Sequence, residues 1–205
     1  MKNSFYDMVK VIDRLQTKEK LSFRDSITLL KILRWNKYKQ YFFTNFEKIE
    51  WFDMLLDAQI LDNNSIPRRI KKGDTVSYPQ WWPGKYLVKV ASKIPDKVFA
   101  VVKKIETNNI SALADCAQAI LSMSPEFLKE NAAEVVNLFD KWLDLEYTGY
   151  IDDIATNLFK KYLNLEFFDE TCMFLNILSK TKLVKPKGVV IFIGVKISST
   201  PASLI

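Results

Sequence analysis

Two pairs of acidic residues are the first candidates for a catalytic or metal-binding site in this chain. Asp140 and Asp144 lie four residues apart, so on a helix their carboxylates would share one face, a spacing that a metal or acid–base site could use. Asp152 and Asp153 form the second pair. No third ligand accompanies either pair, and we therefore interpret both as solvated charges.

Other catalytic or cofactor-binding patterns are missing from the sequence. It contains no histidine, which removes the commonest general base and metal ligand. It has no Cys-x-x-Cys pair and no phosphate-binding glycine loop, and five glycines cannot build a dinucleotide fingerprint. We therefore expect no enzyme activity, no cofactor and no metal. Cys116 and Cys172 lie in apolar helical contexts and are predicted to be buried free thiols rather than a disulfide.

A basic cluster between two helical regions is the first candidate binding site. Arg68, Arg69, Lys71 and Lys72 follow one another around a single isoleucine. Such a cluster could contact phosphates, and each contact would add a salt-dependent increment to binding. The alternative is a charged loop that is simply solvated.

A tryptophan pair is the second candidate site. Trp81 and Trp82 directly precede Pro83 and follow the basic cluster. They could form an aromatic platform for a base or a peptide. The alternative is that both rings cap the first of the following helix pairs and are half-buried there.

Composition and charge indicate a helical protein of ordinary globular type. Hydrophobic residues make up 48% and charged residues 26% of the 205 positions, and the chain has only 5 glycines and 7 prolines. A β-sandwich or barrel would need more tight turns. The net charge of +6 allows an anionic partner without demanding one. We see no signal peptide and no apolar run of membrane-spanning length, so we expect a cytoplasmic protein without membrane contact.

The first 80 residues divide into a helical segment, 1–61, and a basic loop, 62–80. Apolar spacing predicts a short helix from residue 5 to 15 and another from about 22 to 37. Ser22 and Asp25 are spaced as a capping box at the start of the second helix. No helical period survives between residues 62 and 80, which we interpret as an irregular loop.

Residues 81–180 are predicted to form helix pairs, because apolar stripes alternate there with prolines. Three two-helix units can be drawn, at 81–107, 110–146 and 149–180. We predict five or more antiparallel helices and no sheet in this region. The predicted core is Leu87, Ala91, Val98, Val102, Leu113, Ala117, Ile120, Phe139, Leu158 and Leu175.

The paired stripes and mid-unit prolines, as at residues 91–96 and 121–126, resemble HEAT repeats of the α-solenoid class. Residues 78–87 also look like the lead into the helical-repeat part of large bacterial proteins that carry an ATPase or effector domain elsewhere. The resemblance implies an all-α stack of helix pairs that binds a protein partner as a scaffold or regulatory module of a larger assembly. A non-repeating helical bundle is the alternative fold.

The alternative function is nucleic-acid binding, in the style of the HEAT-like DNA alkylation-repair glycosylases. That activity needs a catalytic aspartate in an aromatic cleft, and the sequence identifies none.

Residues 181–205 break the helical pattern. A basic linker leads into an apolar, β-branched run at residues 189–197. Such a run would pack on the last helix, pair with another chain, or represent the remnant of a truncated longer solenoid. We favour the remnant, and expect an extended or disordered tail.

Overall fold

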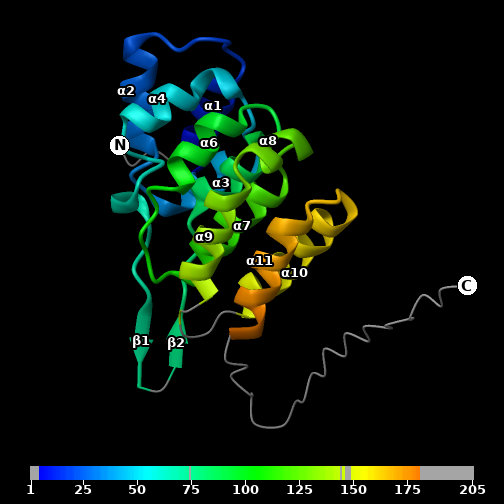
Figure 1. Cartoon of the computed structure of the whole chain (residues 1–205). Helices are drawn as coiled ribbons and strands as arrows, with labels where there is room; N and C mark the ends of the chain where they lie inside the picture. Colours follow the sequence, from blue (N-terminus) through cyan, green and yellow to red (C-terminus); the bar gives the residue numbers. More distant parts are fainter. Residues whose placement is uncertain (1–4, 74, 144, 146–148, 181–205) are drawn as a thin grey trace, which may run out of the picture.

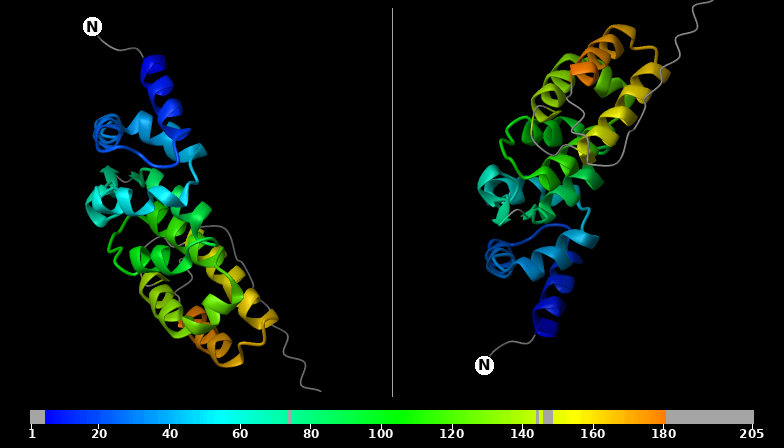
Figure 2. Two further views of the ribbon diagram at one scale, coloured as in Figure 1. Left: turned by 90° about the horizontal axis from the view of Figure 1, so that it is seen from above. Right: turned by 90° about the horizontal axis from the view of Figure 1, so that it is seen from below.

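The helices follow one another along a single long axis, from α1 at one end to α10 and α11 at the other (Figure 2). The computed structural model describes residues 5–73, 75–143, 145 and 149–180. Among these residues it contains eleven α-helices and one two-stranded sheet. The fold is therefore all-α, as the composition and apolar spacing predict.

The N-terminal part contains α1 (Phe5–Gln16), α2 (Phe23–Ile32) and α3 (Asn36–Asn45). The predicted capping box at α2 is confirmed: the Ser22 hydroxyl accepts from the Asp25 backbone N–H, and the Asp25 carboxylate accepts from the Ser22 backbone N–H. A hydrogen bond from the Lys18 ammonium and one from the Ser22 hydroxyl lower the pKa of Asp25 to about 2.

The prediction of one helix over residues 22–37 is wrong, because the chain turns between α2 and α3. Trp35 has an extended backbone, with φ −98° and ψ 125°. On a continuous helix, Leu33 and Tyr38 would point about 140° apart. The turn lets both side chains enter the core, where both are buried.

A short 3₁₀ turn, η1 (Ile49–Trp51), and helix α4 (Phe52–Asp57) complete this part. Aromatic rings pack between this N-terminal part and the helix that contains Tyr86. The ring centroid of Phe46 lies 4.8 Å from that of Trp51 and 5.5 Å from that of Tyr86. The Tyr86 hydroxyl donates to the Lys48 carbonyl at 2.8 Å.

The C-terminal part confirms the predicted helical region, since its described residues hold seven helices and no strand. The expected two-helix unit at residues 110–146 in fact contains three helices, because α8 forms a separate short turn. The helices are α5 (Trp82–Val90), α6 (Pro95–Val102), α7 (Ile110–Leu121), α8 (Pro125–Glu130), α9 (Ala132–Leu143), α10 (Gly149–Asn164) and α11 (Phe168–Lys180).

One row of the stack consists of α3, α5, α7 and α10, each packed on the next (Figure 1). Phe43 of α3 meets Tyr86 of α5, with ring centroids 6.0 Å apart. Lys161 of α10 donates to two carbonyls at the end of α7, those of Leu121 at 3.0 Å and Met123 at 2.8 Å. This lysine stabilises the negative end of the α7 dipole.

A second row follows the order α4, α6, α9 and α11. An ion pair between Lys97 and Asp53 joins α6 to α4, and another joins Lys103, which directly follows α6, to Glu134 of α9; both have 2.7 Å between nitrogen and oxygen. Phe139 of α9 packs edge-on against Phe174 of α11, with 5.5 Å between ring centroids. The two rows bury a continuous apolar core between them, which is how stacked helix pairs are stabilised.

Nine of the ten predicted core residues are buried. The exception is Leu175, which is 44% exposed. It lies on the last described helix, where Phe174 and Ile177 are buried and Leu175 lies on the outward face. The prediction that both cysteines are free thiols is confirmed, but the prediction that both are buried is wrong for one of them. Cys116 is buried, whereas Cys172, like Leu175, lies on an exposed part of α11.

The predictions for the tail concern residues 181–205, which lie outside the described part of the chain. Of the described helices, none has both the length and the apolar character needed to cross a bilayer.

Candidate functional site

The segment predicted as an irregular loop is ordered instead. It contains a 3₁₀ turn, η2 (Asn63–Ser65), and an antiparallel hairpin of β1 (Ile70–Lys72) and β2 (Thr75–Ser77), in which Lys71 pairs with Val76. The Asp62 carboxylate caps η2 by accepting from the backbone N–H groups of Asn64 and Ser65. Gly73 supplies the positive φ, +57°, that a tight hairpin connection needs.

The hairpin stands apart from the helical body, and we call its described residues, 68–73 and 75–77, the basic arm (Figure 1). The two strands contact each other but make no extensive contact with any helix. Arg68, Arg69, Lys71 and Lys72 are all exposed. No described carboxylate forms an ion pair with any of the four. The structure therefore brings the predicted basic residues together on one projecting element.

One buried side chain fixes the base of the arm. The Asn109 side-chain amide donates to the Pro67 carbonyl and to the Pro79 carbonyl, each at 2.8 Å. Its side-chain oxygen accepts from the backbone N–H groups of Ser111 and Ala112, and so caps α7. Asn109 thus holds both ends of the hairpin segment on the first turn of α7.

Replacing Asn109 by aspartate should release the base of the arm while keeping the α7 cap. The carboxylate still accepts from Ser111 and Ala112, but it has no N–H groups for Pro67 and Pro79 and repels their carbonyl oxygens. We expect a loss of about 1–2 kcal/mol in the free energy of unfolding, measured in urea. Asn108→Asp, at the exposed neighbouring position, changes charge equally and should cost much less. Equal losses would show that Asn109 does not anchor the arm.

A polar groove lies at the base of the arm, and we call it the base groove. Its volume is about 730 Å³. Two of the predicted basic residues line it, together with amide and hydroxyl side chains and one carboxylate. The lining residues that carry these groups are Arg68, Arg69, Asn63, Asn64, Thr107, Asn108 and Glu106.

The two predicted tryptophans do not join this groove. Trp81 is 1% exposed, and its indole N–H donates to the Ser65 hydroxyl at 2.8 Å. Trp82 is half-buried at the start of α5. Trp81 therefore has no open face for stacking, and its place in the core resembles the capping alternative.

A buried carboxylate lies beside Trp81. Asp115 of α7 is 4% exposed and pairs with the Lys85 ammonium at 2.7 Å. The Gln80 side-chain amide donates to it at 2.6 Å. Burial raises the pKa of Asp115, and the hydrogen bonds from Lys85 and Gln80 oppose that shift. Since both partners hold the carboxylate in place, its evident role is to tie α5 and the end of the arm segment to α7.

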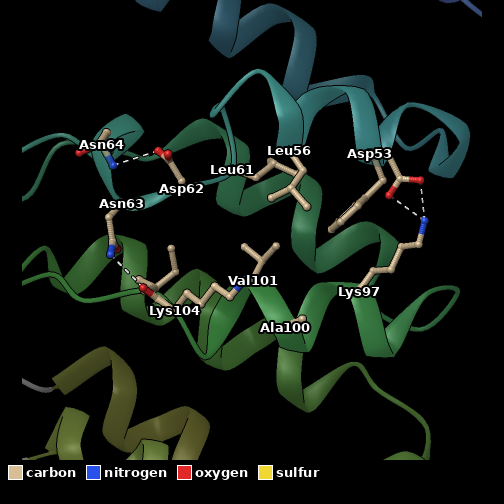
Figure 3. Close-up of a pocket in the computed structure, with 12 residues that line it drawn as sticks. Asp53, Leu56, Leu61, Asp62, Asn63, Asn64, Lys97, Ala100, Val101 and Lys104 are labelled. Carbon is tan, nitrogen blue, oxygen red and sulfur yellow. Dashed lines mark hydrogen bonds and ion pairs between the residues drawn. The ribbon is translucent and has the colours of Figure 1, made fainter.

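An apolar groove of about 350 Å³ lies on the other side of η2, between α4 and α6 (Figure 3). Leu56, Leu61 and Val101 line its middle. The ion pair between Lys97 and Asp53 closes one end, and the hydrogen bond from Asn63 to the Lys104 carbonyl closes the other. This groove could hold an apolar side chain, and Asp53, Asp62 and Lys97 of its lining are engaged in the ion pair or in the η2 cap.

The chain matches no family model, no curated protein and no solved structure. The described residues also contain no group of three or more histidine, cysteine or acidic side chains that could hold a metal ion. The acid pair at Asp152 and Asp153 is therefore not part of such a group, and Asp144, the partner of Asp140, lies outside the described residues.

Sequence reasoning missed Asn109 and Asp115. Asparagine directly before an apolar helical stripe is an N-cap signal, which could have assigned one of the two roles of Asn109. Asp115 stands within the apolar stripe of α7, next to Cys116, and a charge on a buried face implies a partner. Neither signal names the partners, which come from 30 or more residues away.

Proposed function

We propose that this chain is a non-enzymatic interaction module of the helical-repeat class that contacts an anionic partner through the basic arm. The observation that carries the proposal is the arm itself. It adds little to the core, yet Asn109 fixes its base to the stack and all four of its cations remain exposed.

The energetics of the arm support a role outside the molecule. A two-stranded hairpin on its own is marginally stable in water. Four cations within five positions also repel one another, and this repulsion is relieved when an anion binds. An anchored hairpin whose cations are exposed and form no ion pair with a described carboxylate is therefore better suited to binding than to stabilising the fold.

The stacking of helices in two rows supports the assignment to the helical-repeat class and the resemblance to HEAT repeats. The end of the described stack at α11 suits a part of a larger bacterial assembly, because Phe168, Met173 and Leu175 are exposed there. Terminal repeats normally present a polar outer face, so exposed apolar side chains on a terminal helix favour contact with a partner.

Asp115 and Cys116 are buried side chains of types that could act in catalysis, and both serve the packing of the fold, which supports a non-enzymatic role. Asp115 is held by Lys85 and Gln80. Burial raises the pKa of Cys116, so its thiol stays protonated and unreactive at neutral pH. The glycosylase alternative is not favoured, because Trp81 and Asp115 are both buried and form no open aromatic cleft.

The test compares two variants that lose the same charge from different places. The arm variant carries Arg68→Gln, Arg69→Gln, Lys71→Gln and Lys72→Gln. The scattered variant carries Lys10→Gln, Lys31→Gln, Lys141→Gln and Lys160→Gln, all at exposed helical positions. Each removes four cations, so both fall from a net charge of +6 to +2.

On immobilised heparin, the arm variant is expected to elute at clearly lower salt than the scattered variant, because the arm concentrates the charge that a polyanion meets. The unchanged protein should elute last. Coincident elution of the two variants would show that net charge alone governs binding, and the arm would lose its proposed role.

A further inference from the structure

We infer that the anionic partner of the basic arm is a nucleic-acid duplex, bound through its phosphate backbone without regard to sequence. This inference rests on the proposed function, because it names the partner of the same arm. Three features carry it: the placement of cations on both faces of the hairpin, the donors of the base groove, and the kinds of aromatic side chain near the arm.

The hairpin carries cations on both of its faces. Successive strand residues point to opposite sides, so Lys71 and Lys72 of β1 lie on opposite faces of the ribbon. A flat acidic protein surface would meet only one of these faces. The walls of a duplex groove carry phosphates on both sides, and the major groove, about 12 Å wide, admits a two-stranded ribbon.

The base groove adds further cationic and hydrogen-bond-donating groups between the arm and the helical body. Arg68 and Arg69 line it, and Thr107 and Asn108 add hydroxyl and amide donors. Phosphate oxygens accept hydrogen bonds from such groups, and these contacts fix register without reading bases. Among the described residues that line the groove, Glu106 is the acidic one, and the two guanidinium groups outweigh its charge.

The surroundings of the arm favour a duplex over a single strand. Proteins that bind single strands present exposed rings on which bases stack. In the described residues from 62 to 82, the aromatic side chains are Tyr78 and Trp82, which are half-buried, and Trp81, which is buried. None of these three rings is an exposed stacking platform beside the cations, and this arrangement suits a partner whose bases are already paired.

Fluorescence anisotropy of the full chain tests the inference with three probes: a labelled DNA duplex of about 20 base pairs, or two helical turns, one of its single strands, and polyglutamate of similar charge. We expect the duplex to bind at least tenfold more tightly than either other probe at low salt. We also expect the arm variant to bind the duplex at least tenfold more weakly. Its plot of log affinity against log salt should be shallower by about 3 to 4, near one unit for each lost phosphate contact.

The scattered variant is the matched control and should keep most of the affinity and slope of the unchanged protein. Urea unfolding of all three proteins shows whether either variant has lost its fold. Tight binding of polyglutamate but not of duplex would indicate an acidic protein partner, which overturns the inference and leaves the proposed function standing. Preference for the single strand would also overturn the duplex assignment. If no probe distinguishes the arm variant from the scattered variant, both the inference and the proposed function are wrong.

Discussion

Replacing Leu158 by alanine is expected to lower the free energy of unfolding by about 2–5 kcal/mol. Leu158 lies on α10 and is fully buried where that helix packs on the stack. Truncation removes apolar contacts and leaves a cavity that the two rows of helices cannot collapse to fill. Urea denaturation, followed by circular dichroism at 222 nm or by tryptophan fluorescence, measures the loss.

Leu175→Ala provides the matched control, since it makes the same chemical change on the neighbouring helix α11. Its side chain is 44% exposed, so we expect a loss of no more than about 1 kcal/mol. If the two variants lose similar stability, the outward face of α11 must be covered in the protein, and the described packing at that end would be wrong.

Replacing Gly84 by alanine is expected to destabilise the fold by about 1–3 kcal/mol. A Cβ atom at this position would lie 2.8 Å from the Asp115 Cβ and 2.9 Å from Trp81 Cε3. Both neighbours are buried and cannot swing away into solvent. The close approach of α5 to α7 thus depends on glycine here. Thermal or urea unfolding gives the size of the effect.

The sign of the Gly84 effect is informative in itself. At an uncrowded helix position, alanine is more stable than glycine by about 1 kcal/mol, so a gain in stability would contradict the crowding. Gly73→Ala is the contrasting variant. No atom lies within 4 Å of a Cβ built there, but φ is +57°. Its strain is confined to the turn of the arm, and we expect little change in global stability.

The fold was largely predictable because apolar spacing records which helix faces are buried. Val98 and Val102 are four residues apart on α6, and both are buried as that spacing predicts. Leu175 was not predictable in this way. Its spacing marks an apolar face but does not show whether a neighbour covers it. Similarly, Leu33 and Tyr38 each fit a helical pattern, and only the turn between α2 and α3 decides that they belong to two helices.

The candidate site was predictable in composition but not in arrangement. The cations of the arm are evident in the sequence. The hairpin that carries them could not be predicted, because its strands are short and lack the alternating apolar pattern that indicates a strand. Trp81 shows the reverse case: a tryptophan beside a basic cluster suggests a ligand platform, yet its hydrogen bond to Ser65 and its burial place it in the core. In both cases the side chains that fix the arrangement, Asn109 for the arm and Ser65 for Trp81, lie far away in the sequence.

The double role of Asn109 has a consequence for the order in which the chain acquires its structure during synthesis. The carbonyls that it holds belong to Pro67 and Pro79, 42 and 30 residues earlier. On the ribosome the hairpin therefore leaves the exit tunnel well before its anchor does. Since N-terminal segments fold first during translation, the arm must remain untethered until the first turn of α7 emerges. Its final direction is then set in one step with the nucleation of that helix, because the same side chain makes both sets of hydrogen bonds.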